Sequence, residues 1–217
     1  MARPLGQFRR HADYHYQALR CNVDVLRFIQ IGFTFCNADG ELPPGGGTWQ
    51  FNFHFDLGAD MYSQDAVERL TRAGVDFQRH KDEGVEPEDF AALLLTSGLV
   101  LSDDIRWVAF QSGYDFGYLL HVLSAQNLPA EEAEFTELAR TYFPGIFDLR
   151  YLIKSVDNLK GNLQQLADEL DIDRPGRPFH AGSDSVLIAA AFFKIRAAMF
   201  GNKIDETQYL GIVYETS

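Results

Sequence analysis

Two segments in which apolar and polar residues alternate strictly constrain the fold of this chain more than any other feature. In residues 28–37 the apolar positions are Ile29, Ile31, Phe33 and Phe35, and in residues 48–55 they are Trp49, Phe51, Phe53 and Phe55. Alternate residues of a β-strand point to opposite faces of a sheet, so this spacing predicts two strands. The link over residues 38–47 is rich in Gly and Pro and predicts a hairpin with a mobile tip. The aromatic positions of the second strand are expected in the core.

The remainder of the chain alternates between short apolar runs and helical patterns. Further strands are predicted at Arg106–Gln111 and Ile146–Leu149. Helices are predicted at His11–Arg27, Gln64–Thr71, Pro87–Ser97, from Gly113, at Glu131–Tyr142, at Asn162–Leu170, and in a last long helix capped by Ser183. A hairpin followed by alternating strands and helices indicates an α/β fold with a mixed β-sheet flanked by helices. The length of 217 residues predicts one domain over 1–217.

Composition excludes several classes of protein. No apolar stretch is long enough for a membrane span, and the N-terminus has no secretory signal, so we expect no membrane partner. The formal net charge of −12 argues against DNA binding and against any mode that neutralises phosphates over the whole surface. Cys21 and Cys36 are too few for a disulfide framework and are expected to be reduced and buried, in a cytoplasmic or nuclear protein.

Two aspartates carry the strongest chemical signal. Asp115 lies in Ser112–Tyr118 and Asp184 lies in His180–Ser185, and each follows a small-residue turn and opens an apolar helical run. Carboxylate oxygens are the natural ligands of Mg²⁺, so two such helix starts are expected to aim both carboxylates at one metal site. The simpler interpretation is an acid that stabilises the first turn of a helix.

Around these motifs the chain resembles the Caf/Pop-type deadenylases, the poly(A) exonuclease subunit of the Ccr–Not complex. This family belongs to the DEDD exonuclease superfamily, which has four acidic metal ligands and a ribonuclease-H-like fold. The resemblance runs from Ala2 to about Tyr214. It rests on the stretches Ala2–Gly6, Tyr16–Asp24, Thr48–Phe53, Ser112–Tyr118, Asn158–Gly161 and Ala181–Ser185.

The resemblance implies a poly(A)-specific 3′→5′ exoribonuclease that releases AMP by two-metal-ion phosphodiester hydrolysis, with Mg²⁺ or another divalent ion. Asp115 and Asp184 match the third and fourth metal ligands of the family. The general-base His of the family lies five residues before its last Asp, where this chain has Phe179, so His180 is either the working base or an ordinary loop histidine. Lys160 and Leu163 match positions that contact the terminal adenosine.

The first two acidic ligands of the family are an Asp and a Glu, one residue apart, on a strand just before its Ala-Arg-Pro. This chain begins Met1-Ala2-Arg3-Pro4, so we expect the first central strand to be missing and the domain to be N-terminally incomplete. In the family fold that strand pairs with the segments at Ile29–Phe35 and Trp107–Phe110. Its loss predicts a chain that is unstable alone, pairs those edges with another chain, or closes the gap.

The resemblance also implies partners. They are poly(A) RNA, the Ccr–Not scaffold subunit and antiproliferative adaptor proteins, and the implied location is cytoplasmic and nuclear. Because two of four ligands are expected to be absent, an alternative stays open. In that alternative the chain is a catalytically dead or impaired paralogue or isoform that acts as a binding module in the Ccr–Not complex.

Overall fold

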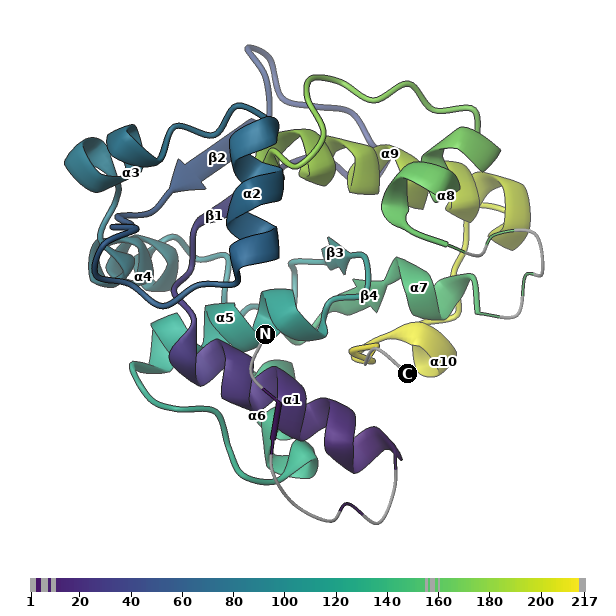
Figure 1. Cartoon of the computed structure of the whole chain (residues 1–217). Coiled ribbons are helices and arrows are strands. Elements are labelled where there is room, and N and C mark those ends of the chain that lie inside the picture. The colour runs from purple at the N-terminus through teal and green to yellow at the C-terminus, as the bar shows by residue number, and fades with distance from the viewer. Residues whose placement is uncertain are drawn as a thin grey trace.

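The computed structural model describes residues 3, 4, 8, 11–154, 156, 159 and 161–214. The strands are β1 (Gln30–Thr34), β2 (Thr48–Asn52), β3 (Trp107–Ala109) and β4 (Ile146–Asp148). The helices are α1 (His11–Val25), α2 (Gln64–Arg72), α3 (Phe77–Glu83), α4 (Pro87–Thr96), α5 (Gly113–Ser124), α6 (Glu132–Tyr142), α7 (Leu149–Leu152), α8 (Leu163–Glu169), α9 (Ala181–Phe200) and α10 (Glu206–Tyr209). The order of these elements confirms the predicted α/β class (Figure 1).

The predicted hairpin forms. β1 and β2 pair in antiparallel register, with Phe33 opposite Trp49. Phe53 and Phe55 are fully buried, as expected for the core face of the second strand. Trp49 is 60% exposed, however, so its assignment to the core was wrong. Trp49 lies near the start of β2. The apolar–polar alternation continues there although helices do not cover this side chain.

The expected single mixed sheet is split into two. β1 and β2 form one two-stranded sheet, and β3 and β4 form a second, parallel one. Over the described residues no strand lies between β1 and β3, and a cavity of about 650 Å³ separates them. The sheet is discontinuous because no described segment pairs with both edges. One of the three outcomes expected for a missing strand was that β1 and β3 would come together and close the gap. The structure does not show this outcome.

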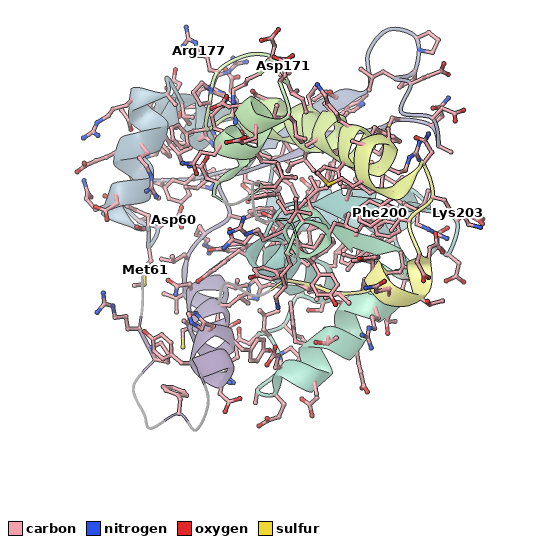
Figure 2. All side chains as sticks on the ribbon, turned by 90° about the vertical axis from the view of Figure 1, so that its right-hand side faces the viewer. Asp60, Met61, Asp171, Arg177, Phe200 and Lys203 are labelled. Atoms are coloured by element: carbon pink, nitrogen blue, oxygen red, sulfur yellow. The ribbon has the colours of Figure 1, made fainter. Side chains whose placement is uncertain are left out.

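Helices cover both faces of the strands. α9 packs against β1, β2, β3 and α8, whereas α5 packs against α1, α4 and α6 (Figure 1). Figure 2 shows the side chains that fill these layers, with Arg177 near the start of α9 and Lys203 beyond its end. The strands thus hold the N-terminal ends of α5 and α9, which carry the two candidate aspartates.

The buried faces of two helices differ from the sequence-based expectation. The spacing of Tyr14, Ala18, Cys21 and Val25 predicts the apolar face of the first helix, but its buried apolar residues are Tyr16, Leu19 and Val23. In α9, which is apolar almost all round, the spacing predicts a face of Val186, Ala190, Phe193 and Ala197, whereas the buried residues are Gly182, Leu187, Ala191, Phe192 and Ile195. Periodicity cannot select one face of such helices. The expected cap is also corrected, because α9 begins at Ala181 with His180 as its N-cap, not Ser183.

Two further sequence-based expectations concern the surface. Both cysteines are free, but Cys36 is exposed and Cys21 is only partly buried. Among the described residues, no helix is both long enough and apolar enough to cross a membrane.

Candidate metal centre

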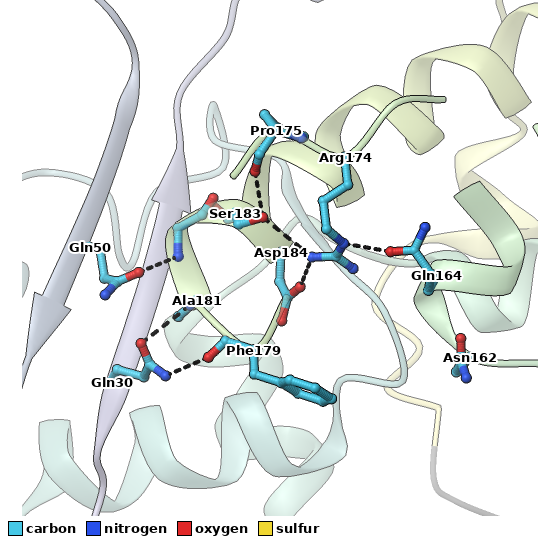
Figure 3. Close-up of polar contacts among 12 residues, drawn as sticks. Gln30, Gln50, Asn162, Gln164, Arg174, Pro175, Phe179, Ala181, Ser183 and Asp184 are labelled. Atoms are coloured by element: carbon cyan, nitrogen blue, oxygen red, sulfur yellow. Dashed lines mark hydrogen bonds and ion pairs between the residues drawn. The ribbon is translucent and has the colours of Figure 1, made fainter. Parts of the chain in front are cut away.

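The first turn of α9 is fastened to the β1–β2 hairpin. The Gln30 side chain donates to the Phe179 carbonyl at 2.9 Å and accepts from the Ala181 N–H at 3.3 Å, and Gln50 accepts from the Gly182 N–H at 2.9 Å (Figure 3). These glutamines satisfy N–H groups that a helix start leaves without intrahelical partners. A Cβ atom at Gly32 would lie 2.1 Å from the Ala181 carbonyl oxygen, so only glycine permits this approach. The hairpin therefore fixes the first turn of α9, which carries Asp184.

Asp184 has a basic partner. Arg174 hydrogen-bonds Asp184 Oδ1 through Nη1 and Gln164 Oε1 through Nε, and it comes within 3.3 Å of Ser183 Oγ (Figure 3). The Arg174 side chain is 11% exposed and that of Asp184 is 37% exposed. The guanidinium thus joins α8 to the start of α9 and neutralises one oxygen of Asp184, while the carboxylate stays accessible.

Asp115 lies in the first turn of α5 and has an altered acidity. Its pKa rises to about 7, first because surrounding protein atoms dehydrate the carboxyl and then because of the charges of Asp148 and Asp184. Asp115 as a whole residue nevertheless has exposed surface. The charge of Asp184 contributes to the rise in pKa although the two residues are 69 positions apart in sequence (184 − 115).

A third carboxylate, Asp148, is 1% exposed and has a structural environment. It accepts hydrogen bonds from the backbone N–H groups of Gln111 (3.1 Å), Ser112 (2.8 Å), Arg150 (2.8 Å) and Tyr214 (3.2 Å), and from Ser112 Oγ (2.6 Å). Gln111 is left-handed, with φ 56°. Asp148 therefore holds the turn that leads into α5 and sets the position of Asp115.

The hydrogen bond that His180 makes is to the end of α2, and not to the carboxylate of Asp115 or Asp184. The His180 Nε2 atom lies 3.1 Å from the Ala73 carbonyl oxygen, at the end of α2. Phe179, which is 50% exposed, points its ring past the Asp184 carboxylate in Figure 3. Leu163 is the first residue of α8 and is partly buried. Lys160 lies outside the described residues.

The arrangement fits a hard cation, but incompletely. Burial first, and then repulsion from Asp148 and Asp184, raises the pKa of Asp115. A divalent cation beside these carboxylates would relieve the repulsion, and oxygen ligands suit Mg²⁺. In the part of the chain that the structure describes, no group of three or more His, Cys, Asp or Glu side chains is arranged to hold a metal. Asp115 and Asp184 are the candidate ligands that the sequence predicts.

Sequence reasoning missed Asp148 and Arg174. Asp148 ends a short apolar strand just before a helix, and this position was a usable signal for a buried acid. Arg174 lies ten residues before Asp184 in a loop. Nothing in its local pattern indicates its partner.

Comparison with known proteins identifies the family. The pattern of the CAF1 family ribonucleases matches residues 100–192, a range that contains Asp115, Asp148 and Asp184. The structure of Pop2p from S. pombe, in a Mg²⁺- and Mn²⁺-bound form, superposes with a TM-score of 0.95 at 48% identity, over 99% of this chain and 84% of that chain. The chain belongs to the CAF1 ribonuclease family.

Other relatives agree with this assignment to the CAF1 family. "Poly(A) ribonuclease pop2" of Schizosaccharomyces pombe is 49% identical over 205 residues, covering 94% of this chain and 61% of that protein. A yeast NOT1 MIF4G domain co-crystallized with CAF1 includes a chain that matches with a TM-score of 0.81 and 32% identity, over 97% of this chain and 83% of that chain. These likenesses confirm the ribonuclease-H-like exonuclease fold. The chain spans less than two thirds of the length of the S. pombe ribonuclease.

The raised pKa of Asp115 predicts a pH-dependent stability for this CAF1-family chain without divalent metal. Between the ordinary pKa of 3.8 and about 7, the folded chain keeps a proton on Asp115 that the unfolded chain has lost. The free energy of unfolding should therefore fall as pH rises through this window and level off above about 7. Urea denaturation from pH 4.5 to 8 should show this decline in the wild type relative to Asp115→Asn. If the difference in free energy of unfolding between the wild type and Asp115→Asn does not change with pH, the raised pKa of Asp115 is contradicted.

Proposed function

We propose that this chain is the catalytic domain of a poly(A)-specific 3′→5′ exoribonuclease, an mRNA deadenylase that releases AMP. The observation that carries the proposal is the match to the CAF1 family ribonucleases over residues 100–192, which contain Asp115 and Asp184 in the first turns of α5 and α9. Family membership supports it, since a relative with 49% identity is named a poly(A) ribonuclease.

Asp115 and Asp184 would hold divalent metal ions in a two-metal site. The S. pombe Pop2p structure, which contains Mg²⁺ and Mn²⁺, supports the choice of ions. When bound, such ions make a water nucleophilic at neutral pH and stabilise charge on the phosphodiester oxygens. The acidic pair that would complete the site is expected upstream of Ala2, on a strand between β1 and β3.

The other residues of the site orient these ligands. Arg174 fixes one oxygen of Asp184, and Asp148 holds the turn before Asp115. Leu163, at the start of α8, and Lys160 are proposed to contact the terminal adenosine. His180 bonds to Ala73 instead of facing Asp184, so its role as a general base would require the loop before α9 to change.

The proposed partners are poly(A) RNA, the scaffold subunit of a Ccr–Not complex and antiproliferative adaptor proteins. The NOT1 co-crystal with a similar chain supports the scaffold. We also propose a cytoplasmic and nuclear location, which rests on the proposed action on mRNA tails. Because the net charge is −12, the protein cannot bind RNA by neutralising phosphates over its whole surface. Metals and local contacts are therefore proposed to hold the RNA.

A second candidate is a binding module without catalysis. It is favoured by two observations: among the described residues no group of three or more possible metal ligands forms, and His180 bonds to the Ala73 carbonyl. In this role the chain would keep the surfaces that contact the scaffold and the adaptors.

A tail-shortening assay separates the two candidates. The 217-residue chain and a version extended upstream along its natural reading frame are incubated with Mg²⁺ and RNA ending in poly(A) or poly(U). We expect the extended version to release AMP from poly(A), and the 217-residue chain to be severely impaired, because charge neutralisation by two ligands is absent. Robust AMP release by the 217-residue chain would contradict the ligand count. An authentic start at Met1 with no upstream acidic pair would favour the binding module.

A further inference from the structure

Phe179 is an exposed aromatic residue just before the helix that carries Asp184. It is 50% exposed, and in the part of the chain that the structure describes it is the one phenylalanine whose side chain is classed as exposed. A single exposed apolar residue is ordinary on a protein surface, so exposure alone identifies nothing. The backbone and the surroundings of Phe179 are what distinguish it.

The backbone of Phe179 is left-handed, with φ 65°. This conformation is a rare outlier for a bulky residue, so the surrounding structure has to hold it there. The Phe179 carbonyl accepts a hydrogen bond from Gln30 Nε2 at 2.9 Å, and Nε2 of the next residue, His180, lies 3.1 Å from the Ala73 carbonyl oxygen. The phenyl ring is therefore presented from a fixed backbone, and little order has to be imposed on the loop when a ligand binds.

The direction of the ring relates it to the proposed adenosine contact. In the view of Figure 3 the Phe179 ring extends past the Asp184 carboxylate, toward the side on which Asn162 is drawn. Asn162 is the N-cap of α8, and Leu163 is the first residue of that helix. An RNA end that lies between the start of α8 and Asp184 would therefore meet the exposed face of the ring.

The chemistry of a phenyl ring limits what Phe179 does. It cannot take up a proton, so this position supplies no general base in this chain. It offers a flat apolar face instead, and the bases of single-stranded nucleic acids stack on such faces. Stacking requires no positive charge, which suits a chain with a net charge of −12.

We propose that the Phe179 ring binds the RNA by stacking on one of the bases at its 3′ end, beside the candidate metal centre. This inference rests on the proposed action on poly(A). It adds a contact that the family resemblance does not supply, because the family has a His at this position. The ligand is thus the π-face of an adenine base, and not its phosphate.

The test combines Phe179 variants with RNA that lacks single bases. Labelled oligo(A) of about ten nucleotides, within the usual range of single-strand sites, is titrated into the 217-residue chain and its upstream-extended version. The tighter binder is used for the variants. Ca²⁺ replaces Mg²⁺ because it takes the same kind of oxygen ligands in a looser geometry, and the RNA is checked for cleavage. Three further oligonucleotides each lack one of the last three bases but keep the backbone.

Phe179→Ala should weaken the binding of intact oligo(A) by about tenfold or more, as expected when a stacking ring is removed. For the oligonucleotide that lacks the stacked base, the same substitution should change the affinity by less than about twofold, because the contact is already gone. Phe179→Tyr keeps the aromatic face and should bind intact oligo(A) like the wild type. A purely structural role would not depend on which base is absent.

Leu101→Ala is the matched control. Leu101 is also apolar, exposed (57%) and left-handed (φ 57°), and its N–H donates to the Tyr142 carbonyl at 2.8 Å, at the end of α6. This variant should bind every oligonucleotide as the wild type does. If Leu101→Ala and Phe179→Ala weakened binding alike, loss of an exposed apolar side chain from a strained backbone would explain both, and the stacking contact would be overturned.

Three other results would also overturn the contact. They are equal weakening by Phe179→Ala for intact and base-lacking RNA, an unchanged affinity, and tighter binding, which would mean that the ring covers the site. The release of AMP in the tail-shortening assay is independent of all three, so the proposed deadenylase function can stand without this contact. If the wild type binds no oligo(A) at all, both proposals fall together.

Discussion

Asp115→Asn and Asp184→Asn, each made in the upstream-extended domain, are expected to lower Mg²⁺-dependent release of AMP from poly(A) by roughly 10²- to 10³-fold or more. Asparagine preserves the shape of the side chain but removes the negative charge that would hold the metal. Both residues lie in the first turn of a helix, and their carboxylates are coupled to each other. The measurement is the single-turnover rate, together with Mn²⁺ binding by titration calorimetry.

Asp65→Asn is the matched control for this pair. Asp65 is also an acid in the first turn of a helix, α2, and it is exposed. If Asp115 and Asp184 only stabilised helix starts, all three variants would lose about the same small amount of stability and no activity. Full activity in either Asp115→Asn or Asp184→Asn would remove that residue from the proposed metal site.

Asp148→Asn is expected to lower the free energy of unfolding by roughly 3–5 kcal/mol, in the range found when one partner of a buried charged contact is removed. Five donors converge on this buried carboxylate, and the amide nitrogen of Asn would face N–H groups instead of accepting from them. A domain is stable by only about 5–15 kcal/mol, so this loss takes a large part of the margin. Urea denaturation at neutral pH measures it.

Asp76→Asn provides the comparison for Asp148. Asp76 accepts one backbone N–H, from Arg79 at 3.1 Å, and it is an exposed N-cap of α3. Asparagine caps helices about as well as aspartate, so its variant should be close to the wild type. If Asp148→Asn were equally harmless, the carboxylate would not hold the turn before α5.

Local pattern predicted the hairpin, most helices and the two coupled aspartates, because each depends on residues near in sequence. Patterns of this kind did not reveal which face of α1 or α9 is buried, since several apolar stripes are compatible with each helix. Nor did they reveal that Trp49 is exposed, because burial depends on what lies opposite a strand.

Contacts between distant residues explain the remaining differences. His180 bonds to a carbonyl 107 residues earlier, at Ala73, and no spacing around His180 signals that partner. The partners of Asp148 at Gln111 and Tyr214 are 37 and 66 residues away. The resemblance to the CAF1 family supplied the candidate site residues, and the structure supplied the cavity between the two sheets.

The donor shell of Asp148 also imposes an order on synthesis. A chain emerges from the ribosome at roughly 5–20 residues per second, N-terminal part first. Gln111 and Ser112 are synthesised before Asp148, whereas Tyr214, which supplies another N–H donor, is synthesised 66 residues after Asp148. Until then the turn before α5 is closed by an incomplete shell. We infer that the nascent chain acquires the final geometry of Asp115 only after translation has passed Tyr214.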